Sequence, residues 1–158
     1  MNRFAIIAVC ATFAWTAHPA PAQNSSAGNA AAAATVSRAL TPEQSSWLAR
    51  ANRHEKAGWI YLHIEGAPRA RGFQYGYLAA PEIKESLRVR KAVWRYQSGL
   101  DWEWLVKRSA KMFTPKVDRE TRDEIDGIVE GLAAAGVAST RDEMVAFNGY
   151  FDLAGYWW

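Results

Sequence analysis

Three acidic side chains lie close to one face of a predicted helix in the second half of the chain. Asp123, Asp126 and Glu130 are separated by three and four residues, so a helix brings them near one another. Paired carboxylates can act as general acid and base or hold a metal ion. However, no histidine stands at the spacing that metal sites of helical bundles use. A solvated acidic face is the preferred interpretation, and we expect no metal ion and no cofactor.

The stretch from Gly66 to Gly72 can be compared with a phosphate-binding loop. It is one residue too long for the Walker spacing and is followed by Phe73 instead of lysine and a hydroxyl residue, which excludes that reading. Gly72, Gly76 and Ala80 share one face of the predicted helix, where two interior glycines cost about 2 kcal/mol relative to alanine. We therefore predict a close backbone contact there. A substrate that approaches the same backbone is the alternative.

The cysteine and the histidines offer no nucleophilic site. Cys10 is the only cysteine and lies in the predicted signal peptide, so the mature chain has no cysteine for catalysis, metal ligation or a disulfide. His54 lies at the charged end of a predicted helix. His63 alternates with the aromatic residues of a predicted strand, and we expect its ring to be half-buried with a polar partner.

The first 22 residues are predicted to be a signal peptide. A short positive region is followed by an apolar core at residues 5–15 and by the cleavage site Ala20-Pro21-Ala22, the pattern of exported proteins. We expect the mature protein to begin at Gln23 and to be periplasmic or secreted. The apolar run is too short to span a bilayer, so no stable membrane insertion is expected.

The composition is that of one modest globular domain. The chain has 158 residues, of which 49% are hydrophobic, enough for a core. The net charge of +3 is small, and no nucleic-acid partner is expected because such partners require a concentrated basic surface. Residues 23–35 are small and uncharged, so residues 23–40 are predicted to be a flexible leader, whereas residues 41–158 are predicted to form an ordered, largely helical segment.

The ordered segment is expected to begin with a helix followed by a strand. Thr41, Pro42 and Gln44 form a capping-box start, and the helix is expected to run to about Lys56 and to end at Gly58. The residues WIYLHI, 59–64, alternate as in a strand, and both faces are largely apolar, so we expect this strand to be covered on both sides.

Further helices are predicted from caps and apolar spacing. One begins at Pro68 and is kinked or broken by Pro81 near Ala80. Others begin at Asp101, at Thr114-Pro115 and after Ser139-Thr140, and Gly136 ends the one before the last. We expect the basic segment 84–95 to lie beside the acidic segment 118–130. An alternative use of the basic segment is binding to a membrane surface.

The last eight residues, FDLAGYWW, are strongly aromatic and carry one charge, Asp152. Two tryptophans at this position would leave a large apolar surface in water. This pattern favours a chain that is truncated, processed, or built to dock on another piece.

Two segments together resemble a known family. LHIEGAPRARGFQYGYLAAPEI, residues 62–83, is similar to the opening of the isopenicillin N acyltransferase-like and phospholipase B-like branch of the N-terminal nucleophile (Ntn) hydrolases, where a strand, a G-x-P turn and a G-x-Q-x-G helix start recur. IDGIVEGLAAAG followed by TRDEMVAFNGYFDL resembles that family's I-x-G-I-x-x-G helix and its D-E-[IM]-x-x-x-N segment before the nucleophile. The matches span residues 59–153.

The resemblance implies an α+β fold, namely the mostly helical amino-terminal part of an αββα Ntn-hydrolase sandwich with one strand near residues 59–64. Such a precursor cuts itself before a cysteine, whose freed amino group then acts as the base for its own thiol. That cysteine would follow FDLAGYWW, so no catalytic residue is expected in this chain. Asn148, Tyr150 and Asp152 are the positions nearest the nucleophile and are the predicted substrate-binding residues.

The function implied is that of the pre-nucleophile segment of an exported hydrolase or acyltransferase. It would be inactive without the downstream catalytic part of the same precursor, which is its expected partner. The helix that carries Gly72 and Gly76 is expected to pack on strands that belong mostly to that downstream part. The substrate would be a small acyl-amide, an acyl-ester or a lipid. The alternative from another class is a freestanding helical periplasmic binding or interaction protein.

Overall fold

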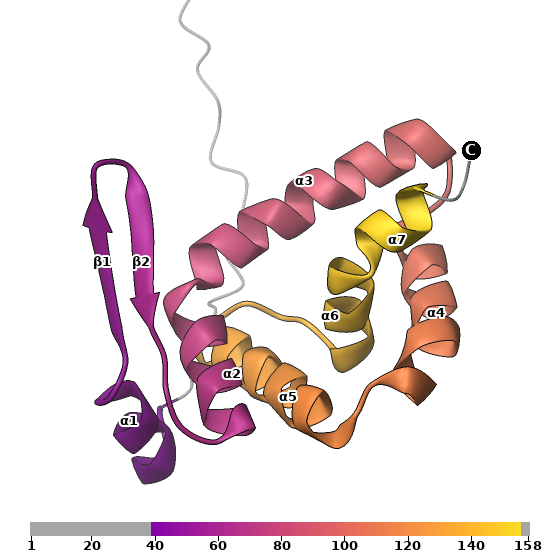
Figure 1. Cartoon of the computed structure of the whole chain (residues 1–158). Coiled ribbons are helices and arrows are strands. Elements are labelled where there is room, and N and C mark those ends of the chain that lie inside the picture. Colours follow the sequence, from indigo (N-terminus) through magenta and orange to yellow (C-terminus); the bar gives the residue numbers. More distant parts are fainter. Residues whose placement is uncertain (1–38, 156–158) are drawn as a thin grey trace, which may run out of the picture. The chain divides into compact units, whose positions relative to one another are not determined.

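The computed structural model describes residues 39–155, which form an α+β arrangement of helices with one two-stranded antiparallel sheet (Figure 1). The predicted signal peptide, 1–22, and residues 23–38 of the predicted leader lie outside the described residues. The elements follow in the order α1 (Pro42–Leu48), β1 (Asn52–Lys56), β2 (Trp59–His63), α2 (Pro68–Leu78), α3 (Ala80–Ser98), α4 (Trp102–Phe113), the 3-10 helix η1 (Thr114–Lys116), α5 (Arg119–Ala134), α6 (Arg141–Asn148) and α7 (Tyr150–Gly155).

Helix α1 begins as predicted but ends much earlier. The capping box is present, since the Gln44 amide donates to Thr41 Oγ1 at 3.1 Å and the Thr41 amide donates to Gln44 Oε1 at 3.0 Å. The predicted continuation to Lys56 is wrong, because residues 52–56 form strand β1. The glycine read as a helix stop belongs to a hairpin turn, where Ala57 and Gly58 have φ of 51° and 81°. Positive φ at both positions is what a two-residue type I′ turn requires.

Strand β2 confirms the predicted strand, but its predicted burial on both faces is wrong. It pairs with β1 alone, from Lys56 opposite Trp59 to Asn52 opposite His63. The side chains of Trp59 and Tyr61 are 71% and 47% exposed. The predicted half-buried position of His63 is also wrong, because its side chain is largely exposed, with Nε2 3.5 Å from Glu65. The hairpin therefore presents apolar side chains to solvent.

Helices α2 and α5 cross in direct backbone contact (Figure 1). A Cβ atom on Gly72 would lie 1.9 Å from the carbonyl oxygen of Glu124, and one on Gly127 would lie 2.1 Å from that of Arg69. The predicted close contact at the α2 glycines is confirmed. Its predicted partner, strands of the downstream part, is wrong, because the facing backbone belongs to α5. The crossing is completed by two further glycines, whose Cβ atoms would lie 2.2 and 2.3 Å from facing carbonyl oxygens: Gly76 and Gly131.

The other helix boundaries lie where local sequence signals predicted them, with one exception. Helix α2 ends at Leu78 and α3 restarts with Pro81 in its first turn, which confirms the predicted break. The predicted helix start at Thr114 is wrong, because these residues form η1 and α5 begins at Arg119 after the Asp118 cap. The caps at Asp101 and Thr140 stand where the sequence predicted them.

The core lies between the helices and is completed by aromatic side chains. Its most buried large residues come from α2, α4, α5 and α6: Phe73, Leu105, Leu132 and Met144. Trp94 of α3 and Trp102 of α4 contact the ring of Tyr150, with ring centroids 6.5 and 6.3 Å apart. This packing fixes the α6–α7 corner against α3 and α4.

Candidate functional site

Two of the three predicted acids of α5 are paired with arginines of neighbouring helices, and the third, Asp123, lies 3.8 Å from Arg119 of α5 itself. Asp126 accepts two hydrogen bonds from Arg141 at 2.6 and 2.5 Å, and Glu130 accepts a bidentate pair of bonds from Arg69. These bonds raise the pKa of both guanidinium groups. The acids thus hold helices together at a partly exposed surface, and they do not form a freely solvated face.

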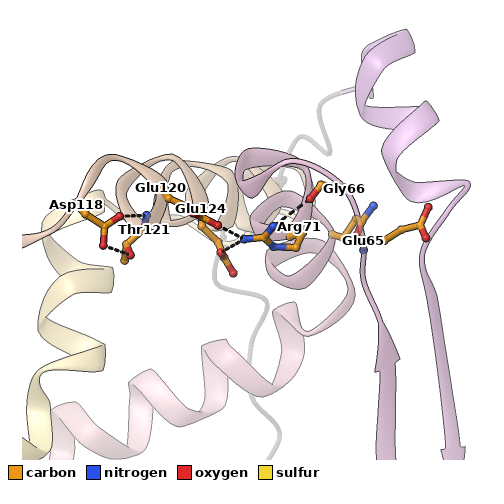
Figure 2. A network of polar contacts seen from close by, with 8 residues as sticks. Glu65, Gly66, Arg71, Asp118, Glu120, Thr121 and Glu124 are labelled. Atoms are coloured by element: carbon orange, nitrogen blue, oxygen red, sulfur yellow. Dashed lines mark hydrogen bonds and ion pairs between the residues drawn. The ribbon is translucent and has the colours of Figure 1, made fainter.

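Arg71 of α2 joins three parts of the fold (Figure 2). It donates to the Gly66 carbonyl at 3.1 Å and to one carboxylate oxygen each of Glu120 and Glu124 at 3.0 Å. Hydrogen bonds to Glu120 and Glu124 raise the pKa of Arg71. The positive charge near the start of α2 therefore has its acidic partner within the chain.

The basic helix α3 does not neutralise α5, and that prediction is wrong. The ammonium of Lys91 lies 2.7 Å from Glu143 of α6. Arg90 donates to the Phe147 carbonyl, and its guanidinium lies 3.8 Å from the centroid of the Phe147 ring. Both cations therefore hold α6 against α3, so they are not free to meet the acids of α5.

A cavity of about 430 Å³ lies between α5 and the α6–α7 pair. Its walls are mainly apolar, because each helix presents one stripe of residues at helical spacing. Gly149 at the α6–α7 junction gives room to the ring of Phe113, since a Cβ at that glycine would lie 2.7 Å from Phe113 Cε2. The apolar wall residues are Phe113, Val117, Ile125, Ile128 and Val145.

The polar groups that line this cavity come from the same two stripes. They are Thr121 and Glu124 of α5, with Asn148 and Asp152 of α6 and α7. Asn148 Nδ2 donates to the Met144 carbonyl at 2.8 Å, which leaves its Oδ1 as an acceptor. No lysine, arginine or histidine lines the cavity. The arrangement can therefore hold an apolar group next to hydrogen-bond acceptors.

The three predicted substrate-binding residues divide between two environments. Asn148 and Asp152 lie one helical turn apart in register and line the cavity together. Tyr150 lies between them in sequence but is 6% exposed and packs against Trp94 and Trp102. The structure thus brings two of the three together and places Tyr150 in the aromatic core.

Sequence reasoning did not find the apolar half of this cavity. Ile125 and Ile128 stand at helical spacing, which predicts one apolar face of a helix, but nothing in the sequence indicates that Val145 and Phe113 line the same cavity. The common signal was helical spacing on two segments about 20 residues apart. Such spacing predicts an apolar stripe but does not say which stripes meet.

No group of three or more histidine, cysteine, aspartate or glutamate side chains in residues 39–155 is arranged to hold a metal ion. Within the same range, no helix combines the length and apolar character that crossing a bilayer requires. The chain matches no protein-family model, no curated protein and no solved structure.

Proposed function

We propose that this chain is the amino-terminal, pre-nucleophile segment of an exported, self-processing hydrolase or acyltransferase of the Ntn class, which acts on amide or ester bonds of acyl compounds. Its αββα sandwich would be completed by a downstream catalytic part of the same precursor. That part would supply the cysteine whose amino group serves as its own base. This chain would contribute helices and one wall of the acyl site.

One observation carries the proposal, namely the glycine contact between α2 and α5. Gly72 and Gly76 belong to the first segment that resembles the family, and Gly127 and Gly131 belong to the second. These two segments are some 50 residues apart, yet their glycines face each other's backbones. A shared packing requirement explains why each segment carries two glycines four residues apart, which supports treating them as one signature.

The β1–β2 hairpin provides additional support for a downstream partner. Trp59, Ile60 and Tyr61 of β2 are exposed, and β2 has only β1 beside it within residues 39–155. A two-stranded hairpin is marginal alone and gains stability when further strands or an apolar layer cover it. In the proposed precursor, the downstream sheet provides that cover.

The test is the intact mass of every polypeptide secreted from the natural reading frame. The proposal expects a fragment that contains residues 41–158 and a second fragment that begins with cysteine. Replacing that cysteine with alanine should leave one uncleaved product. A single product without a following cysteine would overturn the proposal and favour a freestanding helical binding protein, for which the α5–α7 cavity would be the binding site.

A further inference from the structure

We propose that the cavity between α5 and α6–α7 binds an amphiphilic amine, that is, an aliphatic chain that carries a positively charged ammonium group. Identification of this ligand as part of a substrate rests on the proposed function, whereas the binding itself does not. The cavity of about 430 Å³ falls within the roughly 300–1,000 Å³ of typical small-molecule sites.

The walls of the cavity determine the aliphatic part of the ligand. Ile125 and Ile128 of α5 and Val145 of α6 line it, with Val117 from the segment before α5 and Phe113 from the end of α4. These side chains offer no hydrogen bond, so a polar group placed against them would lose its hydration without compensation. A flexible alkyl chain meets this requirement and displaces water from apolar surface.

The polar lining determines the charge of the head group. The Asp152 carboxylate makes no hydrogen bond or ion pair with any of residues 39–155, and its side chain is exposed. Asn148 presents a free Oδ1, whereas the Glu124 carboxylate is bonded to Arg71. The lining thus offers one unpaired carboxylate, one free amide acceptor and no basic group. A head group that donates hydrogen bonds and carries positive charge complements it.

A carboxylate head group would be disfavoured in the same position. It would face Asp152 with like charge and would find at most one amide hydrogen of Asn148 as a donor. An ammonium group would donate charge-assisted hydrogen bonds to Asp152 and to the Asn148 Oδ1. Because of this charge complementarity, the cavity should bind an alkylamine more tightly than the fatty acid of equal length.

A second cavity, of about 550 Å³, offers no comparable preference. It is lined by residues of α1, α2 and α5, including Arg69 and Glu130. These two charges are bonded to each other, and the apolar residues beside Glu43 are Trp47 and three alanines. This cavity therefore lacks the wall of valine, isoleucine and phenylalanine side chains that would hold an alkyl chain.

The test measures binding of three eight-carbon probes to the secreted chain by chemical-shift perturbation and calorimetry. n-Octylamine is expected to bind most tightly, 1-octanol more weakly, and octanoate at least fivefold more weakly than the amine, with shifts at the amides of Thr121, Asn148 and Asp152. Added salt should reduce the advantage of the amine over the alcohol. Equal affinities for amine and octanoate, or no binding by any probe, would overturn the proposal.

Two variants separate the head-group contact from the apolar walls. Asp152→Asn should weaken octylamine binding roughly fivefold, the usual upper effect of a partly exposed ion pair, and should leave octanol binding unchanged. Val117→Trp should fill the cavity and weaken both probes. Asp142→Asn is the matched control, because this acid lies on α6 outside the cavity, and it should bind all probes as the native chain does.

The outcomes distinguish this inference from the proposed function. Octylamine binding that Asp152→Asn weakens supports the inference even if the precursor is never cleaved. Cleavage before a cysteine, with no selectivity among the probes, would support the proposed function and overturn the inference. If Asp142→Asn weakened amine binding as much as Asp152→Asn, the effect would be one of net charge and the cavity assignment would be wrong.

Discussion

Gly76 and Ile128 meet backbone to backbone, so closely that a Cβ atom on Gly76 would lie 2.2 Å from the Ile128 carbonyl oxygen. Real Cβ atoms do not approach a carbonyl oxygen to this distance. Because the obstacle is backbone, no side-chain rotation can relieve it. The α2–α5 crossing therefore depends on glycine at this position.

Replacement of either crossing glycine with alanine should destabilise the fold. Gly76→Ala and Gly131→Ala each gain about 1 kcal/mol of helix propensity, but each also forces the helices apart. We expect a net loss of about 3 kcal/mol in the free energy of unfolding, at the upper end of overpacking effects, measured by urea denaturation of the chain. Ala133→Gly, on the exposed side of α5, is the control and should cost only about 1 kcal/mol. Native stability of Gly76→Ala would contradict the crossing.

Gln74 should be important for stability because it joins three elements from a fully buried position. Its Nε2 donates to the Trp47 carbonyl at 2.7 Å, and its Oε1 accepts from the Glu65 amide at 2.8 Å. Gln74→Leu leaves the Glu65 amide without a partner, whereas the Trp47 carbonyl still accepts from the Arg50 amide at 3.2 Å, and the change should cost about 2 kcal/mol. Gln97→Leu, on the exposed face of α3, should be nearly neutral in the same denaturation measurement. Equal effects of the two changes would show that the buried bonds contribute little.

Asp118 should make the stability of the α5 start depend on pH. The Thr121 backbone amide donates to its carboxylate at 2.8 Å, and this bond, followed by that of the Thr121 hydroxyl, lowers the pKa of Asp118. A lowered pKa in the folded state means that the stabilisation is present at neutral pH and is lost as the pH falls through that pKa.

Asp118→Asn keeps an acceptor at the cap but cannot titrate. We therefore expect the native chain to melt at a higher temperature than this variant at pH 7, and the gap to close as the pH falls below about 4. Melting curves from pH 7 to pH 2 measure this. If the difference in melting temperature stayed constant from pH 7 to pH 2, it would come from side-chain shape or hydrogen bonding and not from the charge of Asp118.

Ala57 is the position where a substitution should stabilise the hairpin. Its φ of 51° lies in the left-handed region, which costs an L-residue about 1 kcal/mol and glycine much less. Ala57→Gly should slow amide hydrogen exchange in β1 and β2, whereas Gly58→Ala should accelerate it. Faster exchange in Ala57→Gly would show that the added freedom of the unfolded chain outweighs the relief of strain.

Helix starts and breaks could be predicted from sequence because their causes are local. Thr41 and Thr140 cap their helices with their own hydroxyl groups, and Pro81 ends one helix where another begins. Each signal acts within four residues and does not depend on the rest of the fold. The glycines of α2 were informative for another reason, since their cost in a helix indicated a close contact somewhere.

Features that depend on distant partners were not predictable in this way. Strand β1 has the sequence NRHEK, which lacks apolar alternation, and it is a strand only because β2 pairs with it. The exposure of β2 could not be read from its composition, which is that of a buried strand. The basic residues of segment 84–95 and the acids of α5 have opposite charge. In the packed structure, however, each group pairs with other residues.

Only the polar residues of the candidate site could be predicted from the sequence. Asn148 and Asp152 were named through the family resemblance, and helical spacing brings both to one cavity. Tyr150 was named on the same basis, but it lies on the opposite side of α7 and its ring joins the core. Which apolar stripe of α5 faces this segment is a property of tertiary packing, which spacing alone does not give.

The hairpin is chemically different along its two borders. The β1 border carries the charges of Arg53 and Lys56, and Arg53 is held by Glu82 of α3 at 2.9 Å, whereas the β2 border carries Trp59 and Tyr61. Charged side chains discourage pairing with another strand, and apolar ones permit it. Of the two edges of the hairpin, the β2 edge is therefore the one suited to pairing with another strand. A sheet that includes the hairpin can be extended beyond β2 but not beyond β1.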